Sequence, residues 1–164
     1  MPPLAGCATL IFPGGTVLTV QPLQRGGCPA CGRTTYGRGA ARIIEAARTA
    51  GGDDLVNDYL TRKPWLLLRN KPRVSEADVA IVFDEYARKG YLRIPTELND
   101  LDISIGLREI KVGAARFPFY ELADQLHPLT VVRLTHGFTK GTDETPRKEI
   151  AKAKAVMEYD RNQP

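Results

Sequence analysis

Cysteines are few in this sequence, and long apolar runs are missing. Three cysteines in 164 residues are an odd number, which argues against a disulfide framework and agrees with a reducing compartment. No run reaches the roughly 18 consecutive apolar residues of a membrane-spanning helix. A signal-peptide pattern is absent as well, because no basic segment precedes the apolar run at residues 8–12 and Pro13 ends that run early. These absences predict a cytoplasmic protein without a membrane partner.

Internal repeats and low-complexity segments are also lacking, which leaves an ordinary globular chain. An apolar fraction of 43% and a charged fraction of 26% are usual for such chains, and the length is sufficient to bury a core. The net charge is +4, with an acidic segment at residues 75–104 between two basic ones. This distribution fits a protein with distinct faces, one of which is either a nucleic-acid surface or simply solvated.

The first half of the chain predicts short strands followed by helices. Two β-prone runs, Thr9–Phe12 and Thr16–Gln21, are separated by Pro and Gly residues typical of a turn. Apolar residues at helical spacing predict a helix over Gly39–Ala50 that ends at two glycines. A second short helix is expected after Asp53 or Asp54, either of which is a good N-cap.

The clearest helix signal lies in the middle of the sequence. Ser75 followed by an acid three residues later is typical of a capping box, and the helix is expected to run to Lys89 and end at Gly90. Acidic residues occupy its first turn and basic ones its last turn, as the helix dipole favours. Residues 91–105 then predict an acidic connection.

The last third predicts a hairpin, a further strand and a closing helix. The hairpin turns at residues 113–115, and Leu129–Thr135 has the composition of a central strand. Thr145 is the expected N-cap of the final helix, with Pro146 at its first position. The predicted fold class is therefore α+β, with a small antiparallel sheet packed by N-terminal helices and a C-terminal helix.

Motifs in this last third resemble one known family. The series consists of residues 106–112 (GLREIKV), Arg116-x-x-x-Tyr120, residues 134–140 (LTHGFTK) and the Thr145-Pro146 helix start. It resembles the HigB-type branch of the RelE/ParE toxin superfamily, which includes many phage-derived proteins. The resemblance extends over roughly residues 75–160, and the His-Gly-Phe-x-Lys and Thr-Pro elements are its specific part.

This resemblance implies a fold, an activity and partners. The fold is a RelE/ParE-like toxin domain over residues 53–164, which leaves residues 1–52 as an N-terminal extension. The activity is that of an mRNA interferase, a metal-independent endoribonuclease that acts on ribosome-bound mRNA and inhibits translation. The second partner is a small helix-turn-helix antitoxin of the HigA type. Gly141 replaces a family lysine and Lys111 a family arginine, which favours an alternative: a non-catalytic phage-type protein that binds a host protein or nucleic acid.

The implied chemistry indicates which residues would form the site. RNA cleavage needs the 2′-hydroxyl deprotonated and in line with the phosphate, positive charge on the developing oxyanion, and a proton for the leaving oxygen. Lys111, Arg116 and Lys140 are candidates for the charge cluster. His136 is the candidate for proton transfer because the ordinary histidine pKa is about 6.5. Tyr120 could orient or stack on a base.

Structural roles are open for the same residues. His136 fits a packed, hydrogen-bonded histidine equally well, and Tyr120 fits the core. The two hairpin cations could instead pair with Glu109 or Glu121. Further contributors near the C-terminus are Tyr159 and Arg161.

A Cys-Pro-x-Cys-Gly motif forms a second candidate site. Cys28 and Cys31 have the spacing of a zinc knuckle, in which a tight turn directs two thiolates at one ion. Four ligands are usual for structural zinc, and a second cysteine pair is missing. Cys7 could be a third ligand, with His127, His136, an acid or a second molecule as the fourth. A metal-free turn is the alternative interpretation.

Overall fold

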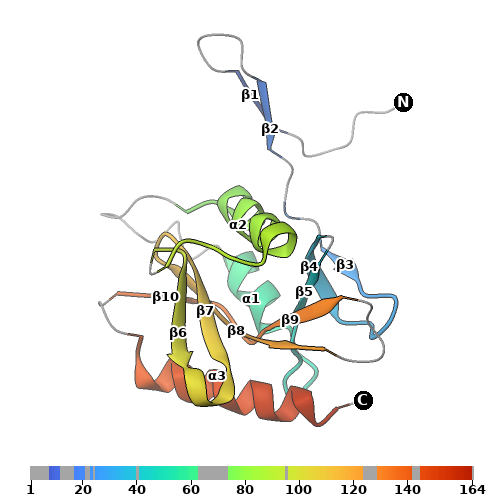
Figure 1. Cartoon of the computed structure of the whole chain (residues 1–164), viewed down its shortest axis with the longest axis vertical. Helices are drawn as coiled ribbons and strands as arrows, with labels where there is room; N and C mark the ends of the chain where they lie inside the picture. Colours follow the sequence, from blue (N-terminus) through green and yellow to red (C-terminus); the bar gives the residue numbers. More distant parts are fainter. Residues whose placement is uncertain are drawn as a thin grey trace.

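The computed structural model of this chain describes residues 8–11, 17–20, 23, 25–39, 41–62, 74–94, 96–123, 129–141 and 145–163. Its main element is an eight-stranded sheet in the order β3-β4-β5-β9-β8-β7-β6, with β10 paired to β8 (Figure 1). The strands are β3 (Gly26–Gly27), β4 (Thr34–Arg38), β5 (Arg42–Ala46), β6 (Leu98–Asp102), β7 (Leu107–Val112), β8 (Ala115–Leu122), β9 (Thr130–Leu134) and β10 (Phe138–Thr139).

Two further strands form a hairpin of their own. β1 (Ala8–Ile11) pairs antiparallel with β2 (Val17–Val20) and does not join the main sheet. Both predicted N-terminal strands are thus confirmed, with boundaries that differ by one residue or so. The expected turn at residues 13–15 lies outside the described residues.

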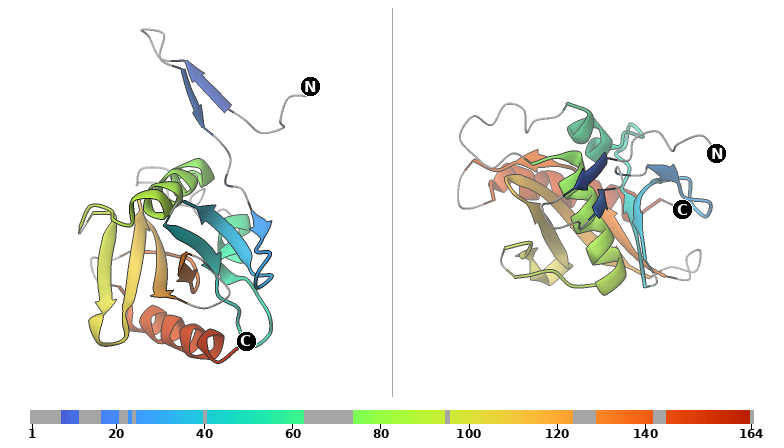
Figure 2. Two further views of the ribbon diagram at one scale, coloured as in Figure 1. Left: turned by 45° about the vertical axis from the view of Figure 1, so that its right-hand side comes forward. Right: turned by 90° about the horizontal axis from the view of Figure 1, so that it is seen from above.

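Three α-helices flank the main sheet in the described part of the chain: α1 (Leu55–Arg62), α2 (Glu76–Lys89) and α3 (Arg147–Arg161). A short 3-10 helix, η2 (Ile103–Ile105), precedes β7. α2 and α3 lie on opposite faces of the sheet, as two views show (Figures 1 and 2). The face under α2 is apolar, whereas the face under α3 carries most of the buried polar residues.

Both ends of α2 form as predicted from local sequence. The Ser75 hydroxyl accepts a hydrogen bond from the Asp78 backbone N–H, and the Asp78 carboxylate accepts one from the Ser75 N–H at 2.7 Å. This reciprocal pair is the capping box. Gly90 ends the helix in the left-handed region with φ of 74°, a conformation that glycine adopts without strain.

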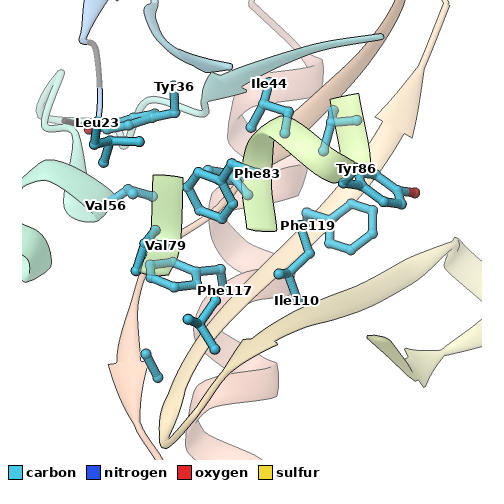
Figure 3. Packing of buried hydrophobic residues seen from close by; sticks show 14 of the residues in the cluster. Leu23, Tyr36, Ile44, Val56, Val79, Phe83, Tyr86, Ile110, Phe117 and Phe119 are labelled. Atoms are coloured by element: carbon cyan, nitrogen blue, oxygen red, sulfur yellow. The ribbon is translucent and has the colours of Figure 1, made fainter. Parts of the chain in front are cut away.

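Aromatic side chains dominate the core between α2 and the sheet. Phe83 of α2 packs edge-on against Phe117 of β8, with ring centroids 5.1 Å apart. Tyr86 meets Phe119 in the same way at 5.4 Å, and Tyr59 of α1 meets Phe117 at 5.7 Å. In Figure 3 the rings of Phe83, Tyr86, Phe117 and Phe119 converge with Ile44 of β5 and Ile110 of β7. Edge-to-face packing of this kind stabilises a pair beyond its buried area.

The predicted fold class is wrong. The sheet is neither small nor antiparallel: it has eight strands, and β5 runs parallel to β9 while the other neighbours are antiparallel. Residues 26–46, expected to form a knuckle and a helix, supply three of these strands. Segments on both sides of the expected domain boundary at residue 52 therefore contribute to one sheet. A C-terminal helix is present as expected.

The predicted helix over Gly39–Ala50 is the main local error. Residues 42–46 form β5, which lies between β4 and β9. Residues 43–46 are all buried, as is usual for a strand covered on both faces. A short apolar run of this kind fits a helix or a buried strand equally well by periodicity. The β-branched pair Ile43-Ile44 favours the strand.

Two smaller predictions also fail. The expected connection at residues 91–105 contains β6, which pairs with β7 at the sheet edge. The expected N-cap of the last helix, Thr145, does not cap it: Pro146 occupies that position, and no side chain caps the helix. The Thr145 hydroxyl instead bonds to Glu109 in β7. The predicted hairpin, the strand at 129–135 and the short helix after Asp54 are confirmed.

Candidate functional site

Three cations predicted from sequence lie near one another, and we call them the cationic cluster: Lys111, Arg116 and Lys140. Lys111 in β7 is directly opposite Arg116 in β8. Lys140 is held beside them because its backbone N–H donates to the Ala114 carbonyl, in the turn of this hairpin, at 2.9 Å. The pKa of Lys111 is lowered by burial and then by the positive charges of Arg116 and Lys140. Lys111 is thus close enough to Arg116 and to Lys140 for their charges to repel its own.

The Arg116 side chain is held by the turn itself. Its Nη1 donates to the carbonyls of Gly113 and Ala115 at 2.5 and 2.9 Å. Its Nε is buried, lies 4.0 Å from Glu109 Oε1 and has no hydrogen-bond partner among the described residues. An unsatisfied buried donor costs about 1–3 kcal/mol. The guanidinium is therefore fixed beside Glu109, with one buried donor whose desolvation is not offset by a hydrogen bond among the described residues.

Glu109 connects the cationic cluster to the start of α3. Its carboxylate is fully buried and accepts hydrogen bonds from the Thr145 hydroxyl at 3.1 and 3.2 Å. Sequence reasoning treated Glu109 only as a competing ion-pair partner for the hairpin cations. A detectable signal for its burial is its position two residues after the buried Leu107, because alternate residues of a strand share one face.

His136 is enclosed rather than presented to solvent. It is 1% exposed, and its ring nitrogens contact the Thr135 hydroxyl at 3.0 Å and the Glu149 carboxylate of α3 at 2.9 Å. Phe138 stacks on its ring with centroids 5.5 Å apart. Burial lowers the pKa of His136, and this effect outweighs the hydrogen bond that the Glu149 carboxylate accepts, which raises it. This arrangement matches the alternative interpretation of His136 as a packed, hydrogen-bonded histidine.

Stability should therefore decrease as pH falls through the ordinary histidine range. The folded-state pKa of His136 lies below the unfolded value, so the unfolded chain takes up the proton first. The contribution of neutral His136 to the free energy of unfolding is fully present above about pH 6.5. It is lost at lower pH, with a slope of at most about 1.4 kcal/mol per pH unit. Urea unfolding between pH 7.5 and 5.5 measures it. A His136→Gln variant should lose this slope, and an unchanged slope would contradict the assignment.

Tyr120 belongs to a buried ionic network under α3, which we define as Arg33, Glu45, Tyr120, Arg133 and Asp160. Its hydroxyl donates to Asp160 Oδ2 at 2.5 Å, and Arg133 Nη1 donates to the same oxygen at 2.6 Å. Arg33 Nε donates to Asp160 Oδ1 at 3.0 Å. Arg133 also bonds to Glu45 in the neighbouring strand, at 3.1 Å. Tyr120 is thus a core residue and is not available to stack on a base.

Opposing effects set the pKa of Asp160 within this network. Burial by itself raises that pKa, but the Tyr120 hydrogen bond and the Arg133 charge hold it below its ordinary value. The aspartate is therefore ionised inside the protein.

Of the two residues proposed near the C-terminus, Arg161 lies over the Tyr120 ring, 4.9 Å from its centroid, and Tyr159 is half-buried.

The cysteine motif lies at one end of the same network. Cys28 is buried and Cys31 half-buried, and neither forms a disulfide with another described residue. The two sulfurs and a carboxylate oxygen of Glu45 lie within 4.8 Å of one another. Sequence reasoning missed Glu45, although a charge inside the apolar run RIIEA is a detectable signal. The other suggested ligands, Cys7 and His127, lie outside the described residues.

Comparisons with known proteins add no family. No model of a known protein family matches this chain, and no curated protein matches it significantly. Among the described residues, no helix combines the length and apolar character needed to cross a membrane.

Proposed function

We propose that this chain is a ribosome-associated mRNA endoribonuclease of the toxin–antitoxin type, neutralised by a small helix-turn-helix antitoxin. The observation that carries the proposal is the cationic cluster, whose three members come from β7, β8 and the segment after β10. The motif series from residue 106 to residue 146 adds the resemblance to HigB-type toxins. The proposal rests on these residues and not on the fold class.

The cationic cluster suits the charge that develops during RNA cleavage. Attack of the 2′-oxygen on phosphorus breaks the bond to the 5′-oxygen and leaves a 2′,3′-cyclic phosphate and a 5′-hydroxyl. A base takes the 2′-hydroxyl proton, and an acid returns one to the 5′-oxygen. The intervening phosphorane carries extra negative charge, which fixed cations stabilise. Arg116 suits this role because its guanidinium carries a positive charge and is fixed in position by two backbone carbonyls.

Lys111 is better placed than His136 to transfer protons. Lys111 is half-buried opposite Arg116, and burial and the neighbouring positive charges lower its pKa, which favours proton transfer from its ammonium to the leaving oxygen. His136 is enclosed under α3 and bonded to Glu149. In this proposal it is a positioning residue that secures the start of α3 above Glu109 and the cluster.

Cleavage of a defined mRNA on purified ribosomes tests the function. The purified chain is expected to cut within the ribosome-bound mRNA, and primer extension maps the cut. A matched mRNA with a 2′-deoxynucleotide on the 5′ side of the mapped bond should stay intact, because that oxygen is the nucleophile. Cleavage of the deoxy substrate would overturn the mechanism. An intact normal mRNA would overturn the enzyme assignment.

A specific observation favours a second function, which is binding without cleavage. His136 and Tyr120 are both buried and bonded within the protein, so neither presents an acid, a base or a stacking ring to RNA. The cationic cluster could then bind the phosphates of a nucleic acid that the protein holds intact. Retention of ribosomes or RNA on the immobilised chain without any cut would favour this function. If the chain neither cuts nor retains RNA or ribosomes, the endoribonuclease and the binding function are both excluded.

A further inference from the structure

We propose that Cys28, Cys31 and Glu45 form a site for one divalent, thiophilic metal ion of the zinc class. The site goes beyond the proposed function because it lies in the N-terminal strands, apart from the cationic cluster. Its three donor atoms come from two segments, the turn between β3 and β4 and the middle of β5. They lie within 4.8 Å of one another.

The backbone of the cysteine turn has the shape of a metal knuckle. The Cys28 N–H donates to the Arg33 carbonyl at 2.8 Å, and the Gly32 N–H donates to the Cys28 carbonyl at 2.7 Å. Gly32 has a φ of 73°, which favours glycine. This tight turn brings the two cysteine side chains to the same side, as a Cys-x-x-Cys metal ligand pair requires.

Donor type and distance both suit zinc. Two thiolates and one carboxylate are ligands that Zn²⁺ accepts, and three protein ligands leave a fourth position open. In tetrahedral geometry, Zn–S bonds of about 2.3 Å and Zn–O bonds of about 2.0 Å place ligand atoms roughly 3.5–3.8 Å apart. The present spread of 4.8 Å closes to this range by a side-chain shift of about 1 Å. Cys31 already donates to Glu45 at 3.3 Å, a contact that the ion would replace.

Charge balance selects a divalent ion. The ionic network carries two positive residues, Arg33 and Arg133, and two negative ones, Glu45 and Asp160. An M²⁺ ion that displaces the protons of Cys28 and Cys31 forms a neutral dithiolate unit and releases two protons. The buried region therefore keeps its charge balance, whereas a monovalent ion would leave a negative charge in a low-dielectric interior.

The position of the site suggests what the metal does. Arg33, at the end of the cysteine turn, pairs with Asp160 in the last turn of α3, and the Arg48 Nη2 donates to the Gly32 carbonyl at 2.7 Å. Glu45 bonds to Arg133, which also pairs with Asp160. A metal here would connect the N-terminal strands to α3 through shared partners. The role is structural, and the stability of the fold should depend on the ion.

Metal titration of the reduced, full-length chain tests the proposal. One Zn²⁺ or Co²⁺ per chain is expected to bind, with release of two protons and a thiolate-to-cobalt charge-transfer band in the near ultraviolet. Binding should raise the melting temperature. Cys28→Ser, Cys31→Ser and Glu45→Gln should each weaken binding by at least about 100-fold, because even the loss of an outer-shell partner costs about 10–100-fold.

Two matched controls separate this site from other thiols and carboxylates. Cys7→Ser and Glu149→Gln should keep the metal, the stoichiometry and the charge-transfer band. Far-UV circular dichroism checks that each variant is folded. If Glu45→Gln does not fold, the two serine variants still test the site, because serine is close to cysteine in volume. Loss of metal in Cys7→Ser together with retention in Glu45→Gln would overturn Glu45 as the third protein ligand. The site would be overturned if the reduced chain takes up no metal and Cys28 and Cys31 instead form a disulfide once the reductant is removed.

Discussion

Replacing Asp160 with alanine is expected to lower the free energy of unfolding by about 3–5 kcal/mol. The carboxylate is fully buried and pairs with Arg33 and Arg133, whose side chains are only 6% and 5% exposed. Removing it leaves two guanidinium groups in the interior without this partner, and their desolvation cost is no longer offset. It also removes the acceptor for the Tyr120 hydroxyl. Urea unfolding followed by far-UV circular dichroism measures the change.

Asp84 provides the matched control for this prediction. It forms an ion pair with Arg88 one helical turn away in α2, and both side chains are more than half exposed. Such pairs contribute less than about 1 kcal/mol, so Asp84→Ala should change the unfolding free energy little. Asp160→Asn should lie between the two because it keeps an acceptor but not the charge. Equal effects of Asp160→Ala and Asp84→Ala would show that the network does not stabilise the fold.

Replacing Arg116 with glutamine is expected to reduce the rate of mRNA cleavage by about 10²–10³-fold, the usual cost of removing one fixed donor to a developing oxyanion. The Arg116 side chain is fixed by two carbonyls of its own turn, so it needs little reorganisation to meet a phosphate. Single-turnover cleavage on ribosomes measures the rate.

Arg108 is the control for charge alone. It lies on β7 like Lys111, but its guanidinium is over the Phe119 ring and pairs with Asp100, on the face covered by α2. Arg108→Gln should leave cleavage nearly unchanged.

In RNA binding, Arg116→Gln should reduce the slope of log K against log salt by about 0.7, the value for one phosphate contact on a single strand. Equal losses in both variants would remove Arg116 from the site.

Local signals predicted those elements whose ends are set by nearby residues. The capping box at Ser75 and the left-handed Gly90 define α2 because both act within one helical turn. The hairpin turn at Gly113, with φ of 57°, follows from glycine's tolerance of that conformation. The predicted turn at residues 113–115 is one residue too long, so the register that places Lys111 opposite Arg116 is known only from the structure.

Elements that depend on distant partners were not predictable in this way. β5 forms because β4 and β9 provide hydrogen-bonding neighbours on both sides, and β9 follows it by more than 80 residues. β6 is polar and gains its strand conformation only as the edge partner of β7. Thr145 leaves its expected capping role because the buried Glu109 carboxylate needs its hydroxyl. In each case tertiary contacts outweigh local preference.

The sequence by itself determined both ends of α2, the existence of the hairpin and the closing helix, because these depend on spacing within a few residues. Only the tertiary structure decided that the sheet is large and mixed, and that His136 and Tyr120 are buried under α3. It also decided which acids lie inside: Glu45 and Asp160 are far apart in the chain, and their cost of burial is offset only when Arg33 and Arg133 reach them in the folded protein.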